Sequence, residues 1–109
     1  MPKLYEYLGI IVFFYSNEHE PIHVHAQYKE YESKAEIYLK NGEITEIKIK
    51  SVSGRKPLKV KQLNNFKKIL KKYAQDIVKK WIDYFVYHNN IKITKIKTRI
   101  KWISQIILQ

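Results

Sequence analysis

Three of the four histidines lie within seven residues of each other, at His19, His23 and His25. We call these three residues the histidine cluster. Imidazole can take up and release a proton near neutral pH, and it is also a common metal ligand. His23 and His25 are separated by one residue, so on a β-strand both rings project from the same face, about 6 to 7 Å apart along the backbone. This segment is therefore the first candidate site.

Metal-free acid and base catalysis is the first of three interpretations of the histidine cluster that remain open. Cleavage of RNA is the natural reaction, because the 2′-hydroxyl is an internal nucleophile and the protein needs to supply only two proton-transfer groups and a cation. Such a ribonuclease would need no cofactor. The candidate catalytic residues are His23, His25, His19 and Glu18.

The other two interpretations assign the histidine cluster different roles. Its imidazoles are suitable ligands for Zn²⁺ or another divalent metal at His19, His23 and His25, with Glu18 or Glu30 as a further ligand. Alternatively, the rings are structural, or contact a partner, on the exposed face of a strand. The residue types and spacing alone do not choose among the three.

The charged residues are distributed unevenly along the chain. Residues 1–50 contain six lysines and eight glutamates, whereas residues 51–109 contain thirteen lysines, two arginines and two aspartates, and the net charge of the chain is +11. A strongly basic half attracts polyanions, so we expect RNA, DNA or a small acidic protein as partner. The candidate nucleic-acid-binding residues are Lys68, Lys71, Lys72, Lys79, Lys95, Lys97, Arg99 and Lys101.

Composition excludes several classes of protein. The chain contains no cysteine, so disulfide frameworks and thiol catalysis are ruled out. The longest uncharged apolar run, residues 8–15, is far shorter than the roughly 20 residues of a membrane-spanning helix, and the N-terminal residues do not resemble a signal peptide. We therefore expect a cytoplasmic protein without a membrane partner.

The first half of the chain has the patterns of β-strands. Residues 8–15 are continuously apolar, which predicts a central strand, and residues 16–21 predict a loop. Residues 22–28 alternate between apolar and polar side chains. Further strands are predicted at residues 34–40 and 43–50, joined by a tight turn at Asn41 and Gly42.

The apolar positions of these last two strands are out of phase. A two-residue turn places Leu39 opposite Ile44 but Ile37 opposite Glu46, although the next apolar residue is Ile47. We therefore predict a β-bulge near Thr45 and Glu46, which returns Ile47 to the core face.

The second half of the chain predicts helices. Residues 51–57 contain Gly54 and Pro57 and predict a connection, and residues 60–87 carry apolar side chains at spacings of three and four. We expect a break near residues 73–75, because one helix of this length would be about 42 Å long. Ile91 and Ile93 predict a short strand or extended entry, and the isoleucines from Ile93 onward, at spacings of three and four, predict an amphipathic helix from about Thr94.

Together these elements predict an α+β fold, in which a small, mostly antiparallel sheet of about four strands is packed by one or two helices. The predicted domain covers residues 1–88, and residues 89–109 form a basic amphipathic tail.

The sequence from Phe13 to His25 reads F-F-Y-S-N-E-H-E-P-I-H-V-H and includes Tyr15, Glu18 and Pro21. It resembles the bacterial domain-of-unknown-function family 4160 over about residues 1–88. The resemblance implies a small protein encoded beside a second small partner, in the manner of toxin and antitoxin pairs. It nominates Glu18, His19, Pro21, His23 and His25 as signature positions without roles. We therefore expect a nucleic-acid-directed protein of such a module, either a histidine-dependent ribonuclease, a non-catalytic binding module or a metal-binding protein.

Overall fold

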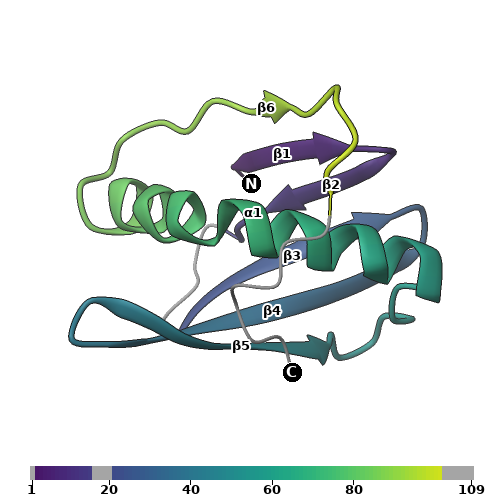
Figure 1. Ribbon diagram of the computed structural model, residues 1–109, viewed down its shortest axis with the longest axis horizontal. Coiled ribbons are helices and arrows are strands. Elements are labelled where there is room, and N and C mark those ends of the chain that lie inside the picture. Colours follow the sequence, from purple (N-terminus) through teal and green to yellow (C-terminus); the bar gives the residue numbers. More distant parts are fainter. Residues whose placement is uncertain (1, 16–20, 102–109) are drawn as a thin grey trace.

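A computed structural model describes residues 2–15 and 21–101 of the chain (Figure 1). One long helix, α1, lies across one face of a six-stranded mixed sheet, whose strand order is β5-β4-β3-β2-β1-β6. The predicted α+β class is confirmed, and the sheet has two more strands than expected. The elements are β1 (Lys3–Tyr7), β2 (Ile10–Phe13), β3 (Ile22–Tyr28), β4 (Tyr31–Lys40), β5 (Glu43–Ser51), α1 (Val60–Phe85) and β6 (Thr94–Lys95).

The apolar run at residues 8–15 is not one strand. A turn at Leu8 and Gly9 separates β1 from β2, and both turn residues have positive φ, at 48° and 83°. The prediction of a continuous strand was wrong here because every residue around the turn is apolar, and leucine rarely adopts a left-handed conformation. The prediction of a central strand holds for β2, which lies between β1 and β3.

The turn and the register of the hairpin of β4 and β5 agree with their prediction. Asn41 and Gly42 have φ values of 53° and 80°, as a tight turn between antiparallel strands requires. Leu39 pairs with Ile44 and Tyr38 pairs with Glu46, so Thr45 is the extra residue of a β-bulge. The bulge brings Ile47 opposite Ile37, and both side chains are buried.

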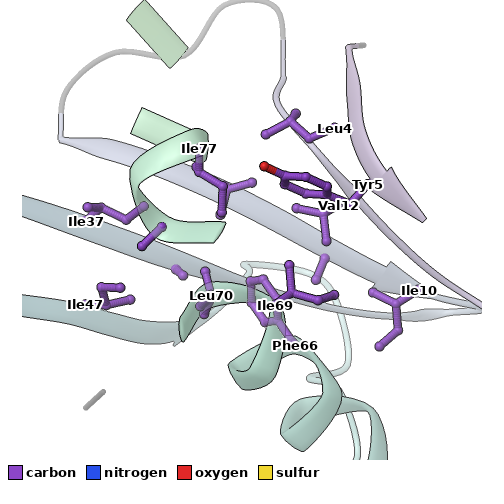
Figure 2. Close-up of a cluster of buried hydrophobic side chains, with 14 of the residues drawn as sticks. Leu4, Tyr5, Ile10, Val12, Ile37, Ile47, Phe66, Ile69, Leu70 and Ile77 are labelled. Carbon is purple, nitrogen blue, oxygen red and sulfur yellow. The ribbon is translucent and has the colours of Figure 1, made fainter. Parts of the chain in front are cut away.

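Helix α1 runs from Val60 to Phe85 without interruption, so the predicted break near residues 73–75 was wrong. This segment contains neither glycine nor proline, and its buried stripe continues through the expected break at Ala74. Figure 2 shows Leu70 and Ile77 of α1 beside sheet residues that include Tyr5 and Ile37. The buried residues of α1 are Phe66, Ile69, Leu70, Ala74, Ile77, Val78 and Trp81.

The segment after α1 is extended rather than helical. β6 pairs in parallel with β1 at the edge of the sheet, and the backbone N–H of Ile96 donates to the carbonyl of Glu6. Ile100 is buried, and its N–H donates to the Tyr7 hydroxyl. The helix predicted from Thr94 is therefore absent over residues 94–101, because edge pairing and the burial of Ile100 hold the chain extended. The division of the chain at residue 88 stays a prediction.

None of the helices in the described part of the chain is both long enough and apolar enough to cross a bilayer.

Candidate functional site

His23 and His25 both project from the face of the sheet that is turned away from α1. The alternating residues of β3, which include Val24 and Ala26, are buried in the core beneath the helix. The two imidazole centroids are 5.5 Å apart, with an angle of 64° between the rings. The strand therefore brings the two rings together, as its alternating pattern predicts.

The two imidazoles have different surroundings. His25 is only 5% exposed: its ring stacks on Phe13 at a centroid distance of 5.5 Å and meets the edge of Tyr15 at 4.5 Å. His23 is partly exposed and lies at the start of β3. Its Nδ1 is 2.8 Å from the carbonyl oxygen of Pro21. The pair thus consists of one ring held in an aromatic niche and one ring closer to solvent.

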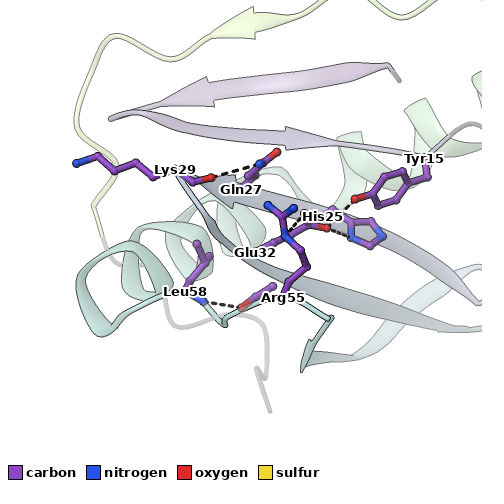
Figure 3. A network of polar contacts seen from close by, with 8 residues as sticks. Tyr15, His25, Gln27, Lys29, Glu32, Arg55 and Leu58 are labelled. Carbon is purple, nitrogen blue, oxygen red and sulfur yellow. Dashed lines mark hydrogen bonds and ion pairs between the residues drawn. The ribbon is translucent and has the colours of Figure 1, made fainter. Parts of the chain in front are cut away.

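A buried carboxylate, Glu32, contacts His25 from the adjacent strand β4. Its Oε2 is 3.0 Å from Nδ1 of His25 and accepts a hydrogen bond of 2.9 Å from the Tyr15 hydroxyl. Its Oε1 is 3.6 Å from Nε of Arg55, which lies after β5. Glu32 itself is 1% exposed. Figure 3 shows its contacts with Tyr15, His25 and Arg55. We call Tyr15, His23, His25, Glu32 and Arg55 the imidazole–carboxylate site.

Glu32 was missed in the sequence because the predicted strand began at Lys34. The observed strand β4 begins at Tyr31, directly after the turn at Lys29 and Glu30. In this hairpin Gln27 pairs with Glu32 and His25 pairs with Lys34, so Glu32 is the diagonal neighbour of His25 on the same face. A strand extended back to Tyr31 would have revealed this contact. Arg55 had no comparable sequence signal, because a loop positions it.

The hydrogen bonds determine the tautomer of each ring. A carbonyl oxygen can only accept, so Nδ1 of His23 carries the proton that it shares with Pro21. The carboxylate of Glu32 likewise requires a proton on Nδ1 of His25. In the neutral form of each ring, Nε2 is therefore the nitrogen that can take up a proton. Because Glu32 also holds the orientation of His25, this arrangement corresponds to the carboxylate–imidazole pairs of hydrolases.

The metal interpretation gains no support from the described residues. Within residues 2–15 and 21–101, no three histidine, cysteine, aspartate or glutamate side chains are grouped so that they could hold a metal ion. Two members of the predicted ligand and catalytic sets, Glu18 and His19, lie outside the described residues. Glu30 is exposed at the turn between β3 and β4.

The positive charges beside the histidines belong to the sheet and its loops. Lys34 is the cross-strand partner of His25, and Lys50 forms an ion pair of 2.9 Å with Glu36. Burial alone would raise the pKa of Glu36, but hydrogen bonds from Tyr38 and Lys50 and the charges of Lys50 and Lys34 lower it. The carboxylate of Glu36 therefore remains ionised and neutralises part of this charge.

The predicted nucleic-acid-binding residues lie elsewhere on the molecule. Those on α1 are on the opposite side of the sheet from the imidazole–carboxylate site, and those in and after β6 are exposed at the β1 edge of the sheet. The structure therefore does not bring the predicted basic set together with the histidines. The α1 residues are Lys68, Lys71, Lys72 and Lys79, and the residues of the C-terminal segment are Lys95, Lys97, Arg99 and Lys101.

Tyr28, Tyr31 and Tyr38 are the tyrosines that the sequence nominates for stacking on nucleic-acid bases. All three are partly exposed, and each has a lysine ammonium between 5.1 and 5.4 Å from its ring centroid. A cation over the ring uses the negative face of the π system. Base stacking at these tyrosines stays a prediction.

Comparison with protein families matches residues 9–82 to a domain of unknown function, DUF4160. The match covers more than half of the 109 residues, so the chain belongs to the DUF4160 family, and the resemblance seen in the sequence is confirmed. The matched region extends from the turn before β2 into α1 and contains His23, His25, Glu32 and Arg55. Searches of curated proteins and of solved structures gave no significant match.

Proposed function

We propose that this protein is the RNA-directed member of a toxin–antitoxin type module and that its imidazole–carboxylate site cleaves RNA without a metal. The observation that carries the proposal is the pairing of His25 with the buried carboxylate of Glu32, together with a second imidazole at His23 whose ring centroid is 5.5 Å from that of His25. Two proton-transfer groups side by side are what cleavage through the 2′-hydroxyl requires. As part of this proposal, the protein acts in the cytoplasm on cellular RNA, and a small acidic protein restrains it.

The two imidazoles divide the proton transfers between them. His25, oriented by Glu32, removes the proton of the 2′-hydroxyl through Nε2, and the 2′-oxygen attacks phosphorus. His23, in its protonated form, donates a proton to the departing 5′-oxygen. The bond between phosphorus and the 5′-oxygen breaks, leaving a 2′,3′-cyclic phosphate and a 5′-hydroxyl. Lys34 and Arg55 supply positive charge for the phosphate from the same face of the sheet.

The test uses the purified protein and a labelled RNA oligonucleotide. We expect His23→Ala and His25→Ala each to lower the cleavage rate by about 10²- to 10⁴-fold, the usual contribution of a general acid or base. Glu32→Gln should lower the rate by a smaller factor, because the amide keeps the size of the side chain but cannot act as the carboxylate. His88→Ala is the matched control, since His88 is exposed beyond the end of α1.

Two further arms separate the alternatives. Replacing the 2′-hydroxyl at the cleavage position by hydrogen should abolish the reaction, and a chelator should leave the rate unchanged. Cleavage at the wild-type rate by the His23→Ala, His25→Ala double variant would disprove the catalytic role of the pair. Loss of activity on chelation, restored by Zn²⁺, would favour the metal interpretation instead.

A non-catalytic binding module is the second candidate function. It is favoured by the position of the α1 lysines, of which Lys72 and Lys79 are exposed, on the side of the sheet opposite the histidines. Binding of nucleic acid by these lysines should weaken steeply between 50 and 200 mM salt, because phosphate contacts release condensed counterions. Salt-insensitive binding would contradict this candidate.

A further inference from the structure

A pocket on the other side of the molecule from the imidazole–carboxylate site is lined by two cations and by no carboxylate of the described chain. Its volume is about 400 Å³, and its lining residues are Leu8, Tyr28, Lys61, Gln62, Asn65 and Arg99. We call it the cationic pocket. Ligand sites for small molecules typically have volumes of about 300 to 1,000 Å³. The cationic pocket therefore has the size of a site for one small molecule or one nucleotide unit.

Four separate segments of the chain form the cationic pocket. Leu8 comes from the turn between β1 and β2, and Tyr28 from the end of β3. The first two turns of α1 contribute Lys61, Gln62 and Asn65, and the segment after β6 contributes Arg99. Burial of Ile100 and the hydrogen bond from its N–H to Tyr7 anchor the residue next to Arg99. The arginine is thus brought to the pocket by fixed backbone contacts.

The polar side chains of this pocket have no ion-pair or hydrogen-bond partner among the residues that the structure describes. Across residues 2–15 and 21–101, the side chains of Lys61 and Arg99 form no ion pair, and those of Gln62 and Asn65 form no hydrogen bond. By contrast, Lys50, Arg55 and Lys80 all contact carboxylates of the described chain. Two unmatched cations in one concave site favour an anionic ligand, and the arginine fork is suited to phosphate.

The remaining wall of the pocket is apolar, and one of its residues has an unfavourable backbone conformation. Leu8 is 47% exposed and has a φ of 48°, a conformation that leucine rarely adopts. Glycine at position 9 allows the Tyr28 ring to lie against the turn, because a Cβ there would be 2.9 Å from its Cε1. An isobutyl group and an aromatic ring beside two cations match a heterocyclic base that carries a phosphate.

The geometry points to the cationic pocket as a binding site for a nucleoside monophosphate group, in which Lys61 and Arg99 hold the phosphate and Leu8 and Tyr28 contact the base. Gln62 and Asn65 are placed to hydrogen-bond the sugar or the edge of the base. The group can come from a free nucleotide or from the phosphorylated end of an RNA. This assignment goes beyond the proposed function, because the pocket and the histidines occupy opposite sides of the sheet.

Equilibrium binding to the full chain tests the proposal directly. Isothermal titration calorimetry at fixed salt should show saturable binding of AMP, at least tenfold tighter than binding of adenosine or of inorganic phosphate. Lys61→Ala and Arg99→Ala should each weaken AMP binding about tenfold or more, as expected for loss of a charge-assisted hydrogen bond. Lys92→Ala is the matched control, because Lys92 is exposed and lies outside the pocket.

Further arms identify the source of the group and separate this proposal from RNA cleavage. A 2′-deoxy oligonucleotide is compared with and without its 5′-phosphate. If the 5′-phosphorylated form binds at least tenfold more tightly than the 5′-hydroxyl form, the ligand is a nucleic-acid end. If the two bind equally, the ligand is a free nucleotide. Leu8→Asn should weaken binding of AMP but not of phosphate. The His23→Ala, His25→Ala double variant should bind AMP like the wild type. Absence of saturable AMP binding, or equal AMP affinity in the Lys61→Ala, Arg99→Ala double variant, would overturn the assignment.

Discussion

The carboxylate of Glu32 receives contacts from side chains of three separate segments. Tyr15 follows β2, His25 belongs to β3 and Arg55 lies after β5. A carboxylate that is 1% exposed requires such partners, since an unpaired buried charge is strongly unfavourable. Glu32 therefore fixes the orientation of His25 and also links the sheet to the loop after β5.

Leu8 has a positive φ of 48°, a backbone conformation that is unfavourable for a leucine side chain. Asparagine tolerates the left-handed region much better than leucine, so Leu8→Asn should raise the free energy of unfolding by about 0.5 to 1 kcal/mol. Urea denaturation monitored by circular dichroism measures this change. Leu39→Asn is the control, because Leu39 is similarly exposed but lies in strand β4 and does not have a positive φ. Destabilisation by Leu8→Asn would show that the Leu8 side chain contributes more to folding than its backbone costs.

The histidine pair could be predicted from the sequence, and its carboxylate could not. Alternation along residues 22–28 is sufficient to place His23 and His25 on one face, because the side-chain period of a strand is two. Glu32 depends on where the next strand begins, and the turn at Lys29 has no glycine to mark it. The position of Arg55 depends on the path of the loop after β5, and contacts between residues distant in the sequence determine that path.

At the level of elements, α1 and the hairpin of β4 and β5 differ in how well their patterns specify them. The bulge at Thr45 could be predicted because the apolar residues of β4 and β5 face the same side only if one strand has an extra residue. A break in α1 was expected near residues 73–75 because of the helix's length, but α1 lies across several strands of the sheet and stays continuous. The turn at Leu8 was missed because apolar residues lie on both sides of it, and β6 lies where isoleucines at spacings of three and four predicted a helix.

Ala74 lies at the centre of the face that α1 packs on the sheet, and it is 1% exposed. Ala74→Ile should lower the free energy of unfolding by about 1 to 3 kcal/mol, because a larger side chain overpacks a filled core. Chemical denaturation gives the value. Gln75→Ile is the matched control, since Gln75 is exposed on the same helix and shares the cost of a β-branched residue. Equal effects of the two substitutions would contradict tight packing at Ala74.

At the scale of the whole molecule, two carboxylates make stability depend on acid pH. Burial alone would raise the pKa of Asp76, but hydrogen bonds from Tyr5 and Lys80, with the charges of Lys80 and Lys79, lower it. The pKa of Glu36 is lowered as described above. Both folded-state pKa values lie below their ordinary values of 3.8 and 4.5. The stabilisation is therefore complete above pH 4.5 and is lost as the pH falls through the folded-state pKa values.

We accordingly expect the melting temperature to fall between pH 5 and pH 3. Asp76→Asn should lower the melting temperature at pH 6 and make it less dependent on pH, as thermal scans by circular dichroism would show. Asp83→Asn is the control, since the Asp83 side chain has no ion-pair partner in residues 2–15 and 21–101. An unchanged slope in Asp76→Asn would exclude the contact with Tyr5 and Lys80 as a source of the acid dependence.

The parallel pairing of β6 with β1 joins the first and the last strands of the part of the chain that the structure describes. During translation, β1 through β5 and α1 are available for assembly while the outer edge of β1 still lacks its neighbour. A nascent chain that stops before Thr94 would expose that edge to other chains and would also lack Arg99. Synthesis of β6 and of Arg99 therefore both covers this edge of the sheet and completes the lining of the cationic pocket.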